Sequence, residues 1–458
     1  MKIGLVGWGI ETQSAYRYFG SNHSYIICNE HEDESLPAHS NVTLSTNHVT
    51  RDHGDAGSSK DLSYLKPLDE CELIIYSPVS WNNLKVAFAG QEDFLSRCKT
   101  VQHIFFEKAD QTRIIAITGT KGKSTVADVC ARMLEAAGKT VFLGGNIGIG
   151  SLDFLDEFNS DLDSICVLEL SSYQLNNLTL SPRVAVLLAI TPEHLDWHGT
   201  FDRYASAKAN ITIHQSASCT LIYDQRNKVA CGIADKSSAN KVGFPNAKSP
   251  IRGTEEPNPE NKILFKSGET VETFIRGKHN MYNLEAASLA CSVFSDDFQI
   301  FGEVARNYRG LSHRLETVDT INGVTYINDS IASTPEASLA GIDSFSEPVV
   351  LLIGGHDRGL DIQEYCRHIK ERLGHLRQVI IFGEVANRLS STLKDYSVPH
   401  LKVDGMENIV NLASECAKSG DVVLLSPGFS SYDSYLKFSF RGDDFKNYVR
   451  KLAPTNDR

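Results

Sequence analysis

The stretch Ala-Ile-Thr-Gly-Thr-Lys-Gly-Lys-Ser-Thr, residues 116–125, directly follows the apolar pair Ile114-Ile115. A strand that breaks into a glycine-rich turn is typical of a phosphate-binding loop. The backbone N–H groups around Gly119 and Gly122 are then free to surround phosphate oxygens. This stretch therefore predicts a nucleotide site between a strand and a helix.

The residues that follow the turn support this interpretation. Lys123 would add a positive charge, and Ser124 would offer a hydroxyl to Mg²⁺. Residues 126–137 form a good helix pattern, so the phosphates would lie at a helix N-terminus. The spacing departs from the standard P-loop, which has a glycine where this chain has Ile117. A plain glycine turn between strand and helix is the alternative.

Length and composition limit the classes of protein. With 458 residues, the chain is long enough for about three domains. Its net charge of −12 argues against a nucleic-acid partner, which would require clustered Lys and Arg. The ten cysteines form no Cys-x-x-Cys pair, so we expect neither structural zinc nor a disulfide framework. Because signal-peptide and membrane-span patterns are lacking, we expect a cytoplasmic protein with small-molecule partners and no membrane association.

The first 110 residues predict a Rossmann-like unit. Strands are expected at 3–6, 25–28 and 73–76, with a helix at 12–19. The turn at Gly7 has the pattern Gly-x-Gly but carries Thr12 where a third glycine would stand. Taken alone, this motif fits nucleotide binding and a simple tight turn equally well.

Two further units follow, at 111–310 and 311–458. Apolar runs that alternate with helical stretches predict an α/β fold with parallel sheets. The expected strands lie at 165–170, 185–190, 349–353, 379–382 and 422–425, and the polar segment 235–262 is expected to form loops among short strands. In such sheets, ligands bind at the carboxyl ends of the strands.

Three side chains in the segment 111–310 are candidates for chemistry. Glu169 ends an apolar strand and would either cap the next helix or bind Mg²⁺; we favour the metal because Ser171 can act as the cap. His194 also follows a strand and is a candidate for a second Mg²⁺, although a lone histidine is usually structural. The sequence pattern alone gives Lys208 no role beyond that of a solvated helix lysine.

Taken together, the motifs resemble those of the ATP-dependent Mur ligases of peptidoglycan synthesis. The resemblance covers nearly the whole chain and rests on the order and spacing of these segments: 118–125, 144–148, 168–175, 193–196, 204–208, 277–283, 313–314, 328–330, 354–355 and 425–427. It implies three domains: a Rossmann-like UDP-binding domain, a P-loop-type central ATPase domain with a parallel sheet, and a Rossmann-like C-terminal domain. It also implies a monomer.

The resemblance further implies an activity: amide-bond formation between a carboxylate and an amino acid through an acyl phosphate. Glutamate would be added to UDP-N-acetylmuramoyl-L-alanine, using ATP and two Mg²⁺ ions. The implied metal ligands are Ser124, Glu169, His194 and a carbamylated Lys208. The implied ATP contacts are Gly119, Thr120, Lys121, Gly122, Lys123, Ser124, Thr125, Asn283, Arg314 and Asp329. Lys123, Lys208, His194 and Arg314 would be catalytic, and Gly7, Thr12, Ser77 and Asn146 would contact the UDP substrate.

The amino-acid pocket departs from the family pattern. Ile331 stands where the family has a lysine, and Ser333 stands where it has a threonine. Arg358 is the counterpart of a later family lysine, while Ser431 and Phe438 match the remaining contacts. The ATP residues are complete, so we expect a glutamate ligase. D-Glutamate is the family default, and L-glutamate is an alternative suggested by Ile331.

Three other functions compete with this interpretation. A folylpolyglutamate synthase shares the central domain but would leave the first 110 residues unexplained. A nicotinamide oxidoreductase could use the Gly7 turn but not the phosphate loop, Glu169 or His194. A non-catalytic nucleotide-binding protein would be expected to lack the metal and phosphate residues, all of which are present.

Overall fold

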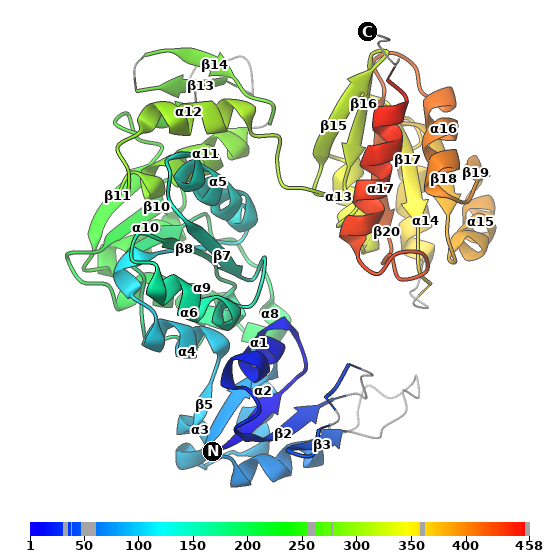
Figure 1. Ribbon diagram of the computed structural model, residues 1–458. Helices are drawn as coiled ribbons and strands as arrows, with labels where there is room; N and C mark the ends of the chain where they lie inside the picture. The colour runs from blue at the N-terminus through cyan, green and yellow to red at the C-terminus, as the bar shows by residue number, and fades with distance from the viewer. Residues whose placement is uncertain are drawn as a thin grey trace. The chain divides into compact units, whose positions relative to one another are not determined.

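A computed structural model describes residues 1–30, 35–37, 39–46, 61–253, 262–266, 268–275, 278–357 and 362–453. The chain divides into two compact units, Met1–Tyr308 and Arg309–Arg458. The first unit contains two parallel sheets and a small antiparallel sheet, and the second unit contains one mixed sheet (Figure 1). The predicted α/β class is therefore confirmed. The finer division at residues 110 and 310 stays a prediction.

The first sheet has the strand order β3-β2-β1-β4-β5, and every neighbouring pair is parallel. The inner residues of its central strands are apolar and buried because helices cover both faces. The strands are β1 (Lys2–Val6), β2 (Ser24–Asn29), β3 (Val42–Thr46), β4 (Leu73–Tyr76) and β5 (Cys98–Lys99). The helices are α1 (Ile10–Phe19), η1 (Ser63–Glu70), η2 (Pro78–Ser80), α2 (Trp81–Ala87), α3 (Glu92–Ser96) and α4 (Val101–Lys108).

The second sheet has the order β11-β10-β9-β6-β8-β7 and is also parallel. Its strands are β6 (Ile114–Thr118), β7 (Val141–Gly145), β8 (Ile165–Glu169), β9 (Val184–Leu187), β10 (Thr220–Asp224) and β11 (Asn240–Phe244). Its helical segments are η3 (Gln111–Arg113), α5 (Lys123–Ala136), η4 (Ser151–Asp153), α6 (Leu155–Ser160), α7 (Ser172–Leu175), α8 (Leu195–His198), α9 (Phe201–Ile213), α10 (Lys228–Lys236), α11 (Lys278–Cys291) and α12 (Phe298–Asn307).

Two boundaries in this sheet differ from the sequence expectation. The helix after the phosphate loop begins at Lys123 rather than at residue 126, because left-handed Gly122 is its N-cap. The strand expected at 185–190 ends at Leu187, after which the chain turns toward the phosphate loop. The described part of segment 235–262 includes short strands, as expected. One of them belongs to a small antiparallel sheet of β12 (Ile251–Gly253), β13 (Lys262–Phe265) and β14 (Thr270–Glu272).

The second unit is built on a sheet with the order β15-β16-β20-β17-β18-β19. The edge strand β15 is antiparallel to β16, whereas the sequence predicted parallel sheets. Asn322 and Gly323 join it to β16 with φ angles of 52° and 79°, the left-handed pair that a tight hairpin turn requires. The strands are β15 (Glu316–Ile321), β16 (Val324–Asn328), β17 (Val349–Gly354), β18 (Leu376–Phe382), β19 (His400–Lys402) and β20 (Val422–Gly428). The helices are α13 (Pro335–Ile342), α14 (Gln363–Glu371), α15 (Ala386–Asp395), α16 (Met406–Cys416) and α17 (Phe438–Lys451).

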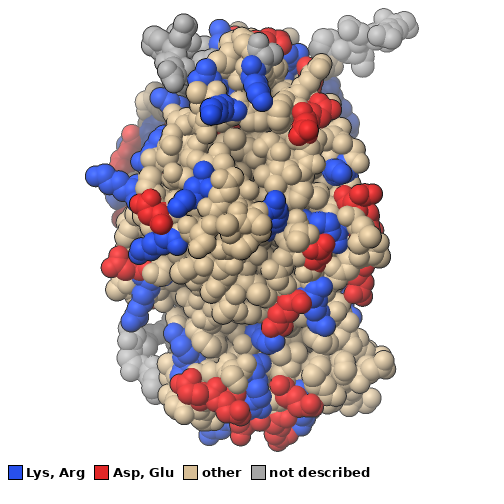
Figure 2. Space-filling model, turned by 90° about the vertical axis from the view of Figure 1, so that its left-hand side faces the viewer, with Lys and Arg blue, Asp and Glu red and all other residues tan. Residues whose placement is uncertain are grey.

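The surface shows charges of both signs. On the face in Figure 2, acidic and basic side chains are interspersed over most of the surface. In the part of the chain that the structure describes, no helix has the length and hydropathy needed to cross a membrane.

Candidate active site

The phosphate loop joins β6 to α5, and its two glycines are required by geometry. Gly119 has a φ of 154°, and a Cβ there would lie 2.5 Å from the Leu188 Cβ. Gly122 has a φ of 88°, and a Cβ there would lie 2.6 Å from the Asn283 Oδ1. Both positions therefore exclude a side chain. The second contact also brings Asn283, which is distant in the sequence, against the loop.

The polar side chains of this loop are arranged around the start of α5. The Lys123 ammonium donates hydrogen bonds to the carbonyls of Gly119 (3.2 Å) and Thr120 (2.9 Å). Ser124 and Thr125 lie half-buried in the first turn of the helix, and Lys121 is exposed. In proteins, a helix N-terminus with a lysine beside it is a common site for anions.

Thr120 ties the loop to the neighbouring strand and helix. Its Oγ1 accepts a hydrogen bond from the Thr191 backbone N–H (2.9 Å) and lies 3.0 Å from the Tyr204 hydroxyl. Its own N–H donates to the Ala189 carbonyl at 2.9 Å. The phosphate loop is thereby fixed to the segment after β9 and to α9.

Glu169 ends β8 and is 1% exposed. Its Oε1 accepts a hydrogen bond from the Asn146 amide (3.0 Å), whereas its buried Oε2 has no hydrogen-bond partner. It does not cap α7, because the Ser171 hydroxyl accepts from the Gln174 N–H there. A buried carboxylate oxygen without a partner is costly unless a ligand binds it, so Glu169 fits a cation.

Lys208 is buried, contrary to the solvated position that its helical pattern suggested. The residue is 1% exposed, and its Nζ donates a hydrogen bond to the Gly119 carbonyl at 2.8 Å. Burial, assisted by the nearby Lys123 charge, lowers the Lys208 pKa to about 7, although Glu193 and Glu169 oppose the shift. Near neutral pH, a substantial fraction of this amine is therefore uncharged and nucleophilic.

His194 lies on the loop after β9, with a left-handed φ of 56°. This backbone conformation is uncommon for residues other than glycine and occurs often at functional sites. The imidazole is 44% exposed and lies 5.0 Å from the Tyr173 ring, measured between ring centroids. The structure thus places Glu169, His194 and the phosphate loop at the carboxyl edge of one sheet, with Lys208 reaching it from α9.

In the described ranges, no three His, Cys, Asp or Glu side chains are close enough together to hold a metal ion. A metal at this edge would therefore require other oxygen ligands. Ser124 and the unpartnered Glu169 Oε2 are two hard oxygens that suit Mg²⁺.

The two turns of the first sheet that were expected to contact a substrate lie side by side. A Cβ on Gly7, whose φ is 78°, would lie 3.1 Å from the Ser77 Cβ. Thr12 closes its own turn: its hydroxyl donates to the Gly7 carbonyl (2.6 Å) and accepts from the Gly9 N–H (3.1 Å). The residue in place of a third glycine therefore has a clear structural role.

In the second unit, Asp329 follows β16 and is 5% exposed. Its carboxylate accepts hydrogen bonds from the Ser426 hydroxyl (2.7 Å) and the Leu315 N–H (3.2 Å). Burial raises its pKa to about 6, although these hydrogen bonds and the charge of Arg314 act in the opposite direction. Asp329 and Arg314 are thus brought near each other, as the sequence motifs suggested.

Arg441 is 1% exposed and was not among the residues expected from the sequence. Its guanidinium donates to the Ser330 hydroxyl (3.0 Å) and to the backbone carbonyls of Ser330, Phe429 and Ser430 at 2.9–3.2 Å. The Ser330 hydroxyl in turn donates to the Phe438 carbonyl at 2.7 Å. The arginine therefore fixes the loop that contains Ser431. Nothing in its local pattern distinguishes it from an exposed helix arginine.

The other residues of the expected glutamate pocket are placed as follows. Ser431 is buried, Ser333 is half-buried, and Phe438 and Ile331 are 38% and 36% exposed. Arg358 lies outside the described residues.

Comparisons with known proteins find relatives over most of the chain. The Mur ligase middle domain matches residues 117–291, and the Mur ligase glutamate ligase domain matches residues 313–429. A UDP-N-acetylmuramoylalanine–D-glutamate ligase of Acetivibrio thermocellus is 32% identical over 404 residues, which cover 85% of this chain and 84% of that protein. A ligase of the same name from Clostridioides difficile is 29% identical and covers 98% of both chains.

Solved structures show the same fold. MurF from Acinetobacter baumannii aligns with a TM-score of 0.56 at 18% identity, over 79% of this chain and 81% of that one. MurC from Thermotoga maritima aligns with a TM-score of 0.54 at 15% identity, over 98% of this chain and 99% of that one. The chain belongs to the Mur ligase family and is an ATP-dependent amide-bond-forming ligase.

Proposed function

We propose that this ligase adds glutamate to UDP-N-acetylmuramoyl-L-alanine in peptidoglycan precursor synthesis. The names of the relatives support this substrate, since the match extends over most of each chain. The structural observation that carries the proposal is the phosphate loop with Lys208 bonded to it and Glu169 at the end of the neighbouring strand β8. Glu169 has an unpartnered carboxylate oxygen there, and Lys208 has an amine of lowered pKa.

The chemistry determines what these residues must do. A carboxylate is a poor acyl donor, so ATP first phosphorylates it, and the amine of glutamate then displaces phosphate from the acyl phosphate. The loop N–H groups and Lys123 would neutralise charge on the transferring phosphoryl group. Asn146, held by the Glu169 carboxylate, would orient the acyl end of the acceptor.

We propose that Ser124, Glu169, His194 and a carbamylated Lys208 hold two Mg²⁺ ions. An uncharged Lys208 amine that captures CO₂ releases one proton and becomes a carboxylate, which would add a hard oxygen ligand to Ser124 and Glu169. When bound, Mg²⁺ would lower the energy of the negative charge that develops on the phosphates.

The remaining contacts are proposed from the family resemblance. The Gly7 and Ser77 turns, with Thr12, would hold the UDP moiety. Asn283, Arg314 and Asp329 would contact ATP, with Arg314 near the transferring phosphate and Asp329 on the ribose. Ser333, Arg358, Ser431 and Phe438 would contact glutamate. We also propose the division into domains 1–110, 111–310 and 311–458, and a monomeric state.

The enantiomer of glutamate is the finer part of this proposal. D-Glutamate is the amino acid in the names of the relatives. Ile331 is half-exposed and supplies no charge where the family pattern has a lysine. We therefore keep D-glutamate as the proposed substrate and treat L-glutamate as the alternative that the altered pocket suggests.

The test is ATP-dependent phosphate release with UDP-N-acetylmuramoyl-L-alanine and Mg²⁺, comparing D- with L-glutamate. Release with D-glutamate is the expected result, and Lys123→Ala should abolish it. Release with L-glutamate alone would show that the pocket selects the other enantiomer. If neither amino acid gives release, the proposed acceptor or amino acid is wrong.

A further inference from the structure

Trp197 connects the elements of the two parallel sheets of the first unit. It belongs to the short helix α8, directly after His194, and its indole N–H donates to the Val79 carbonyl at 3.1 Å. Val79 lies in η2, which follows Ser77 at the end of β4. This hydrogen bond therefore runs from the loop of a proposed metal ligand to the turn of a proposed UDP contact.

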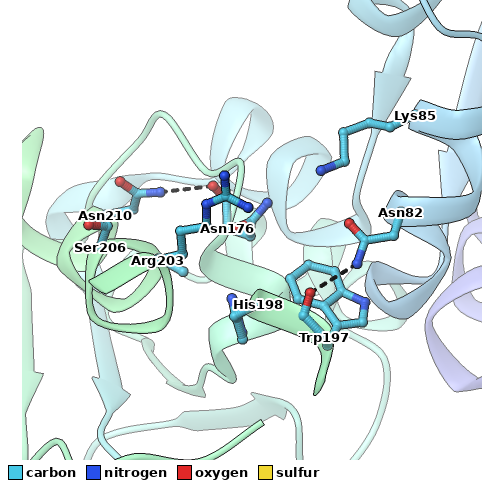
Figure 3. Close-up of a pocket in the computed structure, with 9 residues that line it drawn as sticks. Asn82, Lys85, Asn176, Trp197, His198, Arg203, Ser206 and Asn210 are labelled. Atoms are coloured by element: carbon cyan, nitrogen blue, oxygen red, sulfur yellow. Dashed lines mark hydrogen bonds between the residues drawn. The ribbon is translucent and has the colours of Figure 1, made fainter. Parts of the chain in front are cut away.

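A second hydrogen bond joins the same two segments. The Asn82 amide of α2 donates to the Trp197 backbone carbonyl at 3.1 Å, as the dashed line in Figure 3 shows. Beside this contact, a cleft of about 470 Å³ lies between α2 and α9. Lys85 lines it from α2, and Arg203 and Asn210 line it from α9. Because an open cleft lies beside Trp197, the two hydrogen bonds of this residue are well placed to set the distance between α8 and the segment formed by η2 and α2.

Trp197 is also linked directly to His194. The backbone N–H groups of Trp197 and His198 both donate to the His194 carbonyl, at 3.3 and 3.1 Å. The Tyr173 ring packs edge-on against the Trp197 ring. Its centroid lies 4.9 Å from the Trp197 centroid and 5.0 Å from the His194 centroid. A movement of Trp197 would therefore displace the His194 loop, whose left-handed backbone depends on these neighbours.

A substrate that is held by the first sheet and reacts at the second depends on this spacing. A displacement of about 1 Å can cost about a hundredfold in rate when reactants are held by separate elements. The indole suits such a link because it is rigid and presents a single N–H donor.

We propose that Trp197 is a positioning residue that couples the UDP-binding turn at residues 77–80 to the His194 loop, so that each ligand favours the binding of the other. This inference rests on the proposed function, because the coupled ligands are UDP-N-acetylmuramoyl-L-alanine and ATP. Neither the relatives nor the motifs assign this role to Trp197.

The test measures binding rather than turnover. Calorimetry gives the Kd of UDP-N-acetylmuramoyl-L-alanine at constant Mg²⁺, with and without a non-hydrolysable ATP analogue. By thermodynamic linkage, the Kd without the analogue divided by the Kd with it equals the coupling factor between the two sites. We expect the analogue to tighten binding severalfold in the wild type. In Trp197→Phe, which keeps a ring but loses the N–H, the ratio should fall to near 1, because one hydrogen bond contributes about 0.5–1.5 kcal/mol, or roughly two- to tenfold.

Two further variants make the result decisive. Asn82→Ala breaks the second hydrogen bond from the opposite side and should lower the ratio without touching Trp197. Lys85→Ala lies on the same helix and lines the same cleft but takes part in neither bond, so it should leave the ratio unchanged. Scanning calorimetry verifies that each variant is folded.

The outcomes separate the inference from the proposed function. If Trp197→Phe and Asn82→Ala weaken both Kd values equally, or change neither, the residues are merely structural and the inference is wrong. A wild type whose Kd does not respond to the analogue would also overturn it. If the wild type does not bind the UDP substrate at all, the proposed function fails, and the inference fails with it.

Discussion

Replacing Lys208 with methionine should change how the stability of the first unit depends on pH. The substitution keeps a long, unbranched side chain but removes the amine. Burial lowers the pKa of this amine from 10.5 to about 7. The folded protein therefore releases the proton near pH 7, whereas the unfolded chain keeps it up to about pH 10.5.

The direction and size of the effect follow from proton linkage. Between these two pKa values, the unfolded state binds more protons than the folded state, so the free energy of unfolding rises with pH. The slope approaches about 1.4 kcal/mol per pH unit. From pH 7 to pH 9, the wild type should therefore gain about 2 kcal/mol relative to Lys208→Met. Below pH 7, the cost of the buried charge is fully present, so the difference in the free energy of unfolding between the wild type and Lys208→Met no longer changes with pH.

The assay is urea denaturation in CO₂-depleted buffer without nucleotide, followed by tryptophan fluorescence. The three tryptophans, Trp8, Trp81 and Trp197, all belong to the first unit, so the signal reports on the unit that contains Lys208. The control is Lys228→Met on α10, where the lysine is exposed and no buried charge is removed. Parallel pH–stability curves for the wild type and Lys208→Met would refute the reasoning, because they would show that the folded state does not shift this proton equilibrium.

Three further substitutions test the loops around the site. Gly119→Ala should weaken binding of an ATP analogue more than tenfold in calorimetry, because its Cβ would meet Leu188 at 2.5 Å and its φ is 154°; wild-type affinity would contradict the account of the loop. Asp329 has a pKa raised to about 6, so it loses its charge as the pH falls from 7 to 5, and ATP binding should weaken over that range. Asp329→Asn should bind ATP roughly 10- to 100-fold more weakly at pH 7.5 and lose this pH dependence, since a hydrogen bond to a charged group contributes roughly 1.5–3 kcal/mol; a variant that keeps the same pH dependence would exclude Asp329 as its source. Arg441→Met leaves buried carbonyls and the Ser330 hydroxyl without their donor, so the second unit should lose about 2–4 kcal/mol by scanning calorimetry and the KM for glutamate should rise; unchanged stability would show that water replaces the guanidinium.

The local sequence was sufficient to predict the framework of this protein. The phosphate loop could be recognised because glycines, lysine and serine at this spacing carry the chemistry within ten residues. The strands at β1, β4, β6, β8 and β17 could be recognised because continuous apolar runs are needed where both faces of a sheet are buried. Ser171 was correctly assigned as a helix cap, which left the Glu169 carboxylate available for another role.

Burial and partners of single charged groups were decided by the tertiary structure alone. Lys208 and Arg441 both lie in helices and have no local feature that separates them from solvated residues. Their environments come from Gly119, 89 residues away, and Ser330, 111 residues away. The Glu169 oxygen without a partner and the Trp197–Val79 hydrogen bond are likewise visible only once distant strands are side by side. Periodicity along the chain reports which face of an element is apolar, whereas the pKa of a buried amine depends on the groups that the fold brings around it.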